Sequence, residues 1–447
     1  MFDKLNSALI LRICSLLNPT DILSLSLTCK HAFHTIHKCK FQRKLVPYLL
    51  HPFIYPHTSP TCSTCISSSF SSLSLQALAP SLLSNHLLSS KPSPSVLYPT
   101  PSSVTLITSS PSYFAIGGSD STVSIFARPN VHIGNVVAAK SNFTCSSGIF
   151  LQDDYFIASF NNKSGAAFDC KRSQRIVYKV SPNISNFLKF DSNIWVGTFG
   201  HGISYGDKIR QTSTIYIDEF KTEDNFNKGF SFKFQDSSIK SFFGKGVALI
   251  DFRLPNTVGV KSMIELNRDE KLIDCYDHFD NNYSVHVTDS TISLFDCRKI
   301  DSPISIFDPA HNDTSPIIST AFHAIGHSLL FSASSDSISI YTVLPIIEKI
   351  FEFPCTGCSS IQISKGVLAL VVNGSLLTSS IFELLDNWVE NSGKMTFFDC
   401  FSRIEKSGVQ SIKFDDAGDN FGLFSVSNVV KYYDLNPFKL KTSSLTR

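Results

Sequence analysis

Pairs of cysteines spaced as zinc ligands occur twice in this chain, as Cys62-x-x-Cys65 and Cys355-x-x-Cys358. A structural zinc site needs four ligands, which usually come as two such pairs at a regular spacing. Histidines precede the first pair, but no second strong pair follows it at that spacing, and the later pair is a weaker candidate still. The sequence therefore predicts no metal and no other cofactor.

Known catalytic motifs do not occur in the sequence. It contains no Gly-x-Ser-x-Gly nucleophile turn, no His-Glu-x-x-His helix and no phosphate-binding Walker loop. Adjacent acids occur as Asp153-Asp154 and Asp415-Asp416, but they lie among turn-forming residues, where we expect solvation rather than acid–base catalysis. We therefore expect that the protein is not an enzyme.

The composition is that of a folded protein without a strong electrostatic preference. Of its 447 residues, 43% are hydrophobic and 17% are charged, and the formal net charge is +2. This balance provides no broad basic face for a phosphate backbone, so we expect no nucleic-acid partner. No apolar run approaches the roughly 20 residues of a spanning helix, so we also expect no membrane partner.

The first residues of the chain indicate whether the protein is exported. Lys4 precedes an apolar run as in a secretory signal, but Arg12 interrupts the run and no small-residue cleavage site follows it. Without export, the 12 cysteines are expected to be reduced thiols rather than a disulfide framework. We predict a protein of the cytoplasm, the nucleus or both.

Residues 1–50 are predicted to form a small all-α module. The segment from Ser7 to Leu17 lacks glycine and proline, and its apolar residues cover more than one face of a helix. Asn18-Pro19-Thr20-Asp21 then provides an N-cap, a proline at the first helical position and an acid in the first turn of a second helix. Together with a third short helix, these elements are too small to bury their own apolar surface. Another surface must cover them.

This segment resembles the F-box, the module by which substrate receptors attach to the Skp-family adaptor of cullin-RING ubiquitin ligases. The pattern is matched by Leu5, Ile13, Leu17, Pro19, Asp21, Leu23, Leu25, Leu27, Cys29 and Phe33. It departs from the family at Asn6, where a proline is usual. The resemblance implies a set of adaptor-binding side chains, namely Leu5, Ile10, Ile13, Leu16, Leu17, Pro19, Ile22 and Leu23. The alternative is that the helices dock on the following domain as a cap.

Residues 51–103 are rich in serine and proline, a composition typical of a partly ordered connector. Within it, SSLSLQALAPSLLSNHLL has enough apolar residues for one or two short helices. We interpret the whole stretch as a partly helical linker between the head and the next domain.

A strand–turn–strand pattern recurs through residues 104–440. Its best copies are AIGGSDSTVSIFA at 115–127, SVHVTDSTISLFD at 284–296, LFSASSDSISIYT at 330–342 and GLFSVSNVVKYYD at 422–434. Four looser copies lie between them, and the spacing is about 40 to 45 residues or twice that, the period of four-stranded propeller blades. The pattern predicts a mainly β protein with a β-propeller of seven or eight blades.

The repeats resemble divergent WD repeats. In the copy around residue 336, His311, Ser332 or Ser334, and Asp336 occupy the positions of the family's His–Ser/Thr–Asp network. The family's tryptophan is replaced by other aromatics, and only two tryptophans occur in the whole chain. We expect the turn residues Asp120, Asp289 and Asp336 to stabilise the fold by binding nearby backbone amides.

The two resemblances together imply a substrate receptor. F-box proteins with propellers resemble phosphodegron receptors, in which arginines on one face hold phosphate by bidentate hydrogen bonds. The candidates within the blades are Arg172, Arg175, Arg210, Arg253 and Arg298. The last two also end IDFR and FDCR, which resemble the Asp-x-Arg signature of propellers that bind the damage-binding type of cullin adaptor.

The sequence therefore predicts the substrate-recognition subunit of a Skp–cullin–F-box ubiquitin ligase. Its partners would be the Skp-family adaptor, through it a cullin and a RING protein, and a protein target that is phosphorylated or not. Two alternatives stay open: a WD-like interaction scaffold unrelated to ubiquitin, and a receptor for the damage-binding type of adaptor.

Overall fold

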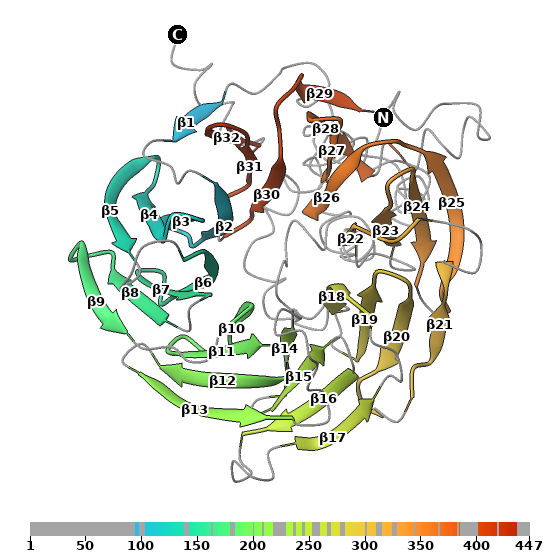
Figure 1. The fold of residues 1–447 in the computed structure, drawn as a ribbon, viewed down its shortest axis with the longest axis horizontal. Coiled ribbons are helices and arrows are strands. Elements are labelled where there is room, and N and C mark those ends of the chain that lie inside the picture. Colours follow the sequence, from blue (N-terminus) through green and yellow to red (C-terminus); the bar gives the residue numbers. More distant parts are fainter. Residues whose placement is uncertain are drawn as a thin grey trace, which may run out of the picture.

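Eight four-stranded antiparallel sheets are arranged as the blades of a propeller around a central axis (Figure 1). The computed structural model describes residues 94–97 and 103–435, except for 138–142, 162–163, 179–183, 200, 208–209, 218–228, 236–237, 244–245, 253–259, 266–269, 278–281, 300–301, 310–314, 324–328, 344–345, 365–366, 382–383, 385–400 and 418–419. The prediction of a mainly β propeller is confirmed, and the number of blades is eight. The predicted helical module at 1–50, with its adaptor-binding residues, lies outside the described residues.

Blades 1 to 7 take their strands in chain order from the axis outwards (Figure 1). Blade 1 contains β2 (Val104–Ser109), β3 (Tyr113–Gly118), β4 (Thr122–Ala127) and β5 (Val131–Val137). Blade 2 contains β6 (Cys145–Leu151), β7 (Tyr155–Phe160), β8 (Ser164–Asp169) and β9 (Gln174–Tyr178). Blade 3 contains β10 (Asn186–Lys189), β11 (Ile194–Phe199), β12 (Gly202–Asp207) and β13 (Gln211–Tyr216). Blade 4 contains β14 (Phe230–Gln235), β15 (Ser238–Phe243), β16 (Gly246–Asp251) and β17 (Val260–Glu265).

The second half of the ring repeats this arrangement. Blade 5 contains β18 (Leu272–Asp277), β19 (Tyr283–Thr288), β20 (Ile292–Asp296) and β21 (Ser305–Phe307). Blade 6 contains β22 (Ser319–His323), β23 (Leu329–Ala333), β24 (Ser337–Thr342) and β25 (Glu348–Pro354). Blade 7 contains β26 (Cys358–Ser364), β27 (Val367–Val372), β28 (Ser375–Ser380) and β29 (Ser402–Glu405). Blade 8 contains β30 (Ser411–Asp415), β31 (Gly422–Val426), β32 (Val430–Asp434) and, at its outer edge, β1 (Ser95–Leu97).

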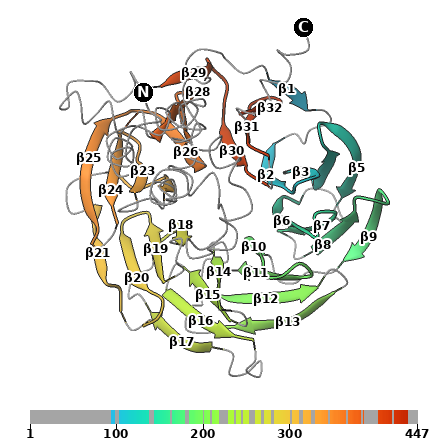
Figure 2. The ribbon, with the colours of Figure 1, turned by 180° about the vertical axis from the view of Figure 1, so that it is seen from behind.

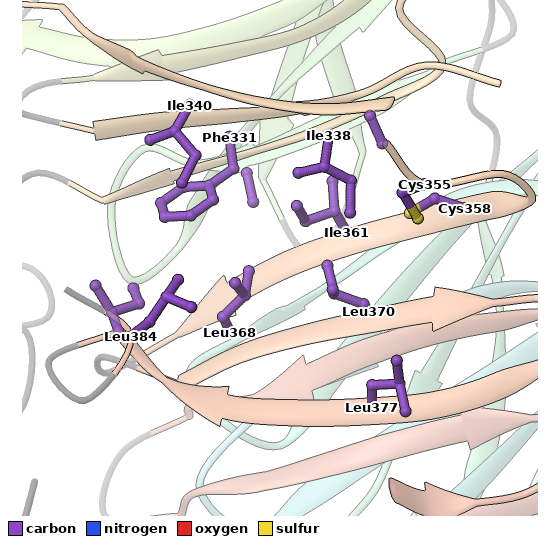
Figure 3. Packing of buried hydrophobic residues seen from close by; sticks show 13 residues of the cluster. Phe331, Ile338, Ile340, Cys355, Cys358, Ile361, Leu368, Leu370, Leu377 and Leu384 are labelled. Carbon is purple, nitrogen blue, oxygen red and sulfur yellow. The ribbon is translucent and has the colours of Figure 1, made fainter. Parts of the chain in front are cut away.

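The second strand of a blade is apolar on both faces because neighbouring blades cover both. β27 reads VLALVV and β7 reads YFIASF, and nearly all of these residues are buried. Figure 3 shows one such interface, in which Phe331 and Ile338 of blade 6 pack on Ile361 and Leu368 of blade 7. Apolar contact between successive sheets therefore holds the ring together, as expected for a propeller.

The ring closes through β1, the first strand in the described part of the chain. Ser95 pairs with Tyr432, and Leu97 pairs with Val430, so β1 completes the sheet formed by the last three strands. Seen from behind in Figure 2, β1 again lies at the outer edge of the blade that contains β32. Residues 95–97 fall in the stretch assigned to the linker by composition, and the propeller therefore includes them.

The aromatic residues that stand in place of the family's tryptophan are core residues. Phe126 and Phe295 are fully buried, and Tyr341 and Tyr433 are 2% exposed. Each lies on the third strand of its blade, where the sequence pattern places it. A buried aromatic at this position thus serves the packing between blades without an indole ring.

None of the helices in the described ranges has the length and apolar character needed to cross a bilayer.

Candidate binding face

The strand order gives the ring two different faces. Within each antiparallel sheet, the turns after the first and third strands lie at one end, and the turn after the second strand lies at the other end. The link from each blade to the next lies at this second end. We call the first end the arginine face, because Arg172, Arg210 and Arg298 lie in turns there, and the second end the connection face.

The arginines of the arginine face occupy turns that are built alike in three blades. In each turn, the aspartate that ends the third strand accepts a hydrogen bond from the backbone N–H of the arginine. The pairs are Arg172 with Asp169 at 3.0 Å, Arg210 with Asp207 at 2.9 Å, and Arg298 with Asp296 at 2.9 Å. An aspartate at the start of a tight turn commonly accepts such a bond. The hydrogen bond to the aspartate fixes the backbone of each arginine within its turn.

Arg298 is held on its own blade. Its guanidinium donates to both carboxylate oxygens of Asp296, at 2.9 and 2.7 Å, and to the hydroxyl of Tyr283 at 3.2 Å. The guanidinium also lies over the Tyr283 ring, 5.5 Å from its centroid. The hydrogen bonds from Arg298 lower the pKa of Asp296. The side chain is nevertheless 56% exposed, so one edge of a rigid cation faces solvent.

The cations of blades 2 and 3 have looser local partners. The side chain of Arg172 is 78% exposed, and its Nε lies 3.8 Å from the Asp169 carboxylate, beyond hydrogen-bond distance. Arg175 on β9 and Arg210 before β13 are both exposed. Guanidinium groups of this kind can bind a carboxylate or a phosphate through two parallel hydrogen bonds. The arginines predicted to bind a phosphate thus come from three blades. The fifth candidate, Arg253, lies outside the described residues.

The acid pairs on the arginine face join blades rather than remaining solvated as predicted. Asp415 is fully buried, because Arg128 of blade 1 binds its two oxygens at 2.7 and 2.9 Å. Asp153 of blade 2 accepts bonds from the backbone N–H and the hydroxyl of Ser112 in blade 1, at 2.9 and 2.6 Å. Burial alone raises the pKa of Asp153, but these bonds and one from Ser110 outweigh it and lower the pKa. The prediction of solvated acids was wrong at Asp415, whereas Asp153 is half-buried.

The connection face carries the aspartates that the sequence predicts to be structural. Asp120 accepts a hydrogen bond from the backbone N–H of Thr122 at 3.2 Å, and Asp289 accepts one from the backbone N–H of Lys271 at 3.3 Å. The first bond closes a turn within blade 1, and the second ties the turn to the link that enters blade 5. Both residues therefore stabilise turns, as expected.

Asp336 lies at the centre of a group of serine hydroxyls. Its carboxylate accepts bonds from Ser334 at 3.1 Å, Ser335 at 3.0 Å and Ser315 at 3.0 Å, and hydroxyls from these residues lower its pKa. Of the two serines predicted to belong to the network, Ser334 is the one that binds Asp336. His311 lies outside the described residues.

Sequence reasoning missed two features of the site. The capping role of Asp169 and Asp207 has a local signal, an aspartate three residues before an arginine at the end of a third strand. The burial of Asp415 has none, because its partner lies 287 positions away in the chain. In the part of the chain that the structure describes, no three His, Cys, Asp or Glu side chains gather as a metal site would require. Cys62 and Cys65 lie outside that part.

The comparisons with known proteins bear on the fold. No protein-family model and no curated protein sequence matches the chain. Among solved structures, Sqt1 from Saccharomyces cerevisiae is similar, with 9% identity, a TM-score of 0.57, and coverage of 74% of this chain and 96% of that chain. The computationally designed Ika8 protein is also similar, with 14% identity, a TM-score of 0.53, and coverage of 76% and 98%. At these identities the likeness concerns the fold alone, and it agrees with the eight sheets described above: the chain has a β-propeller of eight blades.

Proposed function

We propose that this chain is the substrate receptor of a Skp–cullin–F-box ubiquitin ligase. In this proposal residues 3–40 bind the Skp-family adaptor, and through it a cullin and a RING protein. The propeller binds the protein target, phosphorylated or not. The broader role of a protein-interaction scaffold is the one that a WD-like propeller fold supports by itself.

The observation that carries the proposal is the closure of the ring. β1 completes blade 8, and the buried side chains Leu97 and Phe114 belong to the core between blades 8 and 1. The apolar faces of the blades are thus covered by neighbouring blades. The sheets are thus complete without the many apolar residues between Leu5 and Phe33, and a Skp-family adaptor is what the F-box pattern of that segment would bind.

The point where the chain enters the ring also fits this role. Ser95 pairs with Tyr432 toward the end of β32, which places residue 94 at the outer edge of blade 8, on the side of the arginine face. A target held on that face lies on the side where the adaptor-binding segment is attached. Tethering raises the local concentration of the target beside the ubiquitin carrier, so the receptor needs no catalytic group of its own. Such a receptor would act in the cytoplasm, the nucleus or both.

One observation favours a second candidate, a receptor for the damage-binding type of cullin adaptor. In the FDCR sequence, Asp296 holds the guanidinium of Arg298 in a fixed position at the rim, with 56% of the side chain exposed. A rigid, exposed arginine is suited to a protein interface, because little side-chain entropy is lost on binding. The two candidates use different ends of the molecule and can therefore be separated.

The test is affinity purification of the full chain from cells, with and without proteasome inhibition. We expect the wild-type protein to co-purify with the Skp-family adaptor, and its targets to accumulate when the proteasome is inhibited. Leu17→Asp and Leu23→Asp should abolish capture of the adaptor. Val131→Asp is the matched control, because it places the same charge on a side chain that is 58% exposed on β5.

Three results would count against the proposal. Unchanged adaptor capture by Leu17→Asp and Leu23→Asp would show that the F-box pattern does not bind it. Capture of the damage-binding adaptor that is lost in Arg298→Ala would support the second candidate. Partners that depend on the propeller, with neither adaptor present, would leave a scaffold outside the ubiquitin pathway.

A further inference from the structure

The link between blades 6 and 7 brings two cysteines together. Cys355 follows β25, Cys358 begins β26, and only Thr356 and Gly357 separate them. Both are free thiols, 4% and 2% exposed. Figure 3 shows Cys355 and Cys358 next to each other at the edge of the apolar cluster shared by the two blades.

The two thiols interact with each other. Their interaction lowers the pKa of Cys355 and raises the pKa of Cys358 well above the usual range. Cys355 is thus the thiol of the pair that ionises first, and Cys358 is a neutral thiol in contact with it. A thiol of lowered pKa beside a second thiol is the arrangement in which oxidation produces a disulfide.

The other cysteines of the described ranges have no thiol of lowered pKa. Cys145, Cys170, Cys275 and Cys297 are also buried, and burial raises the pKa of each of their thiols. They lie on or beside strands of blades 2 and 5, away from the link that carries Cys355 and Cys358. They therefore provide internal controls for the reactivity of the pair.

The link holds the cysteines in place from the blade 6 side. The backbone N–H of Cys355 donates to the carbonyl of Asp336 at 2.8 Å, and the N–H of Gly357 donates to the carbonyl of Ser335 at 3.2 Å. The acceptors belong to the turn between β23 and β24. The turn that binds the serine hydroxyls through the Asp336 carboxylate thus also fixes the cysteine link.

Asn373, in the turn between β27 and β28, holds the link from the blade 7 side. Its backbone N–H donates to the carbonyl of Gly357 at 2.9 Å, and its side-chain amide donates to the carbonyl of Thr356 at 3.2 Å. Gly357 has a φ of +79°, and a Cβ there would lie 2.1 Å from the Asn373 side-chain oxygen. The close turn that joins the cysteines therefore requires glycine. The native backbone thus holds both cysteines in one short, fixed link.

We propose that Cys355 and Cys358 form a reversible intramolecular disulfide when the protein meets hydrogen peroxide, and that the link between blades 6 and 7 is thus a site of oxidative modification. The Cys355 sulfur attacks one peroxide oxygen and the O–O bond breaks, which produces a sulfenic acid and one water. The Cys358 sulfur then attacks the Cys355 sulfur and the S–O bond breaks. The leaving hydroxide takes the Cys358 proton as a second water. Two thiols lose two electrons, and one peroxide becomes two waters.

The burial of the pair determines which reagent reaches it. A small oxidant such as hydrogen peroxide can enter where a bulky alkylating reagent cannot, so oxidation should be faster than alkylation in the folded protein. Because the backbone on both sides is already held by Asp336 and Asn373, the disulfide should form without unfolding the propeller. A dithiol such as dithiothreitol should reduce the disulfide once the reductant can reach it.

The experiment treats the full chain with hydrogen peroxide under native conditions, alkylates the remaining thiols after unfolding, and maps the peptides by mass spectrometry. We expect the peptide with Cys355 and Cys358 to lose two hydrogen atoms, and dithiothreitol to restore it. In Cys358→Ser, the Cys355 sulfenic acid should accumulate and react with dimedone once the oxidised protein is unfolded. Cys145→Ser should form the disulfide as the wild-type protein does.

Two outcomes would overturn the proposal, and neither depends on a variant. The first is that both thiols remain alkylatable at a peroxide dose that oxidises Cys145 or Cys275. The second is that the disulfide forms only after the protein is unfolded in urea, because the native turn would then have no part in it. A circular dichroism spectrum before and after oxidation checks that the strands persist.

Discussion

Arg128 and Asp415 form a bidentate ion pair between the first and the last blade, with N–O distances of 2.7 and 2.9 Å. The guanidinium also donates to the carbonyl of Ser110, and the hydroxyl of Tyr432 donates to Asp415 at 3.0 Å. The Asp415 side chain is fully buried and that of Arg128 is 15% exposed. The ring is therefore closed twice over, by strand β1 at the rim of blade 8 and by this pair on the arginine face.

Replacing Arg128 with alanine should destabilise the ring strongly. The substitution leaves the Asp415 carboxylate buried without its cation, which typically costs about 3 to 5 kcal/mol. Urea unfolding followed by circular dichroism measures the loss. Arg172→Ala, which removes a side chain that is 78% exposed, is the matched control and should leave the unfolding midpoint unchanged. Equal midpoints for Arg128→Ala and the wild-type protein would mean that the pair does not hold the closure.

The strand β1 should be necessary for a stable propeller. A chain that begins at residue 94 keeps β1, whereas one that begins at residue 103 loses it together with Leu97, which is 1% exposed. Leu97→Ala in the full chain should cost about 2 to 4 kcal/mol, because it leaves a cavity between blades 8 and 1. Val96→Ala is the control, since Val96 is 43% exposed. Similar unfolding curves for the two truncated chains would contradict the role of β1.

The regular spacing of the repeats predicted most of the ring, because an apolar or aromatic residue recurs near the end of the third strand in most blades, as at Phe126, Phe295 and Tyr341. Phe126 and Phe295 were located correctly for this reason. The closure was not predicted: β1 has only three residues, Ser95–Leu97, and their composition does not separate them from the connector before them. These residues form a strand because they pair with the free edge of β32. That edge is distant in the sequence, so the local sequence does not reveal the pairing.

The burial of the charged side chains could not be predicted from the sequence either. Lys240 lies in β15, and nothing local distinguishes it from a solvated lysine at a strand position. Its burial depends on Asp277 of the next blade, whose Oδ1 lies 2.7 Å from Nζ. Asp415 was misassigned for the same reason. The turn aspartates, by contrast, were predicted correctly, because their partners lie within a few residues or in the adjacent link.

Breaking the pair between Lys240 and Asp277 should destabilise the interface between blades 4 and 5. The Lys240 side chain is fully buried, and its Nζ also donates to the Cys297 sulfur at 3.5 Å. Asp277→Ala removes the anion and should cost about 3 kcal/mol or more, whereas Lys240→Met combined with Asp277→Leu should cost much less, since no buried charge then remains. Chemical unfolding of the single and the double variant measures the difference. A double variant as unstable as Asp277→Ala would contradict this account.

Stability should fall as the pH drops from about 6.5 toward 4. Burial lowers the pKa of His323 to about 4 and also lowers the pKa of His286. Each base binds a proton more weakly in the folded state, so its contribution is fully present above the unfolded pKa of 6.5 and is lost below it. For His323 the loss reaches about 3 kcal/mol at pH 4. Unfolding of the wild-type protein and of His323→Leu across this range gives the difference, and identical pH profiles would contradict the assignment.

The most direct test of the central claim mixes the purified full chain with a purified Skp-family adaptor and measures binding by calorimetry and size-exclusion chromatography. The account predicts a stoichiometric complex with the wild-type protein and with Val131→Asp, and binding at least roughly tenfold weaker for Leu17→Asp, because a central apolar contact would be lost. A wild-type chain that is folded by circular dichroism and forms no complex, or a Leu17→Asp chain that binds equally well, would contradict it.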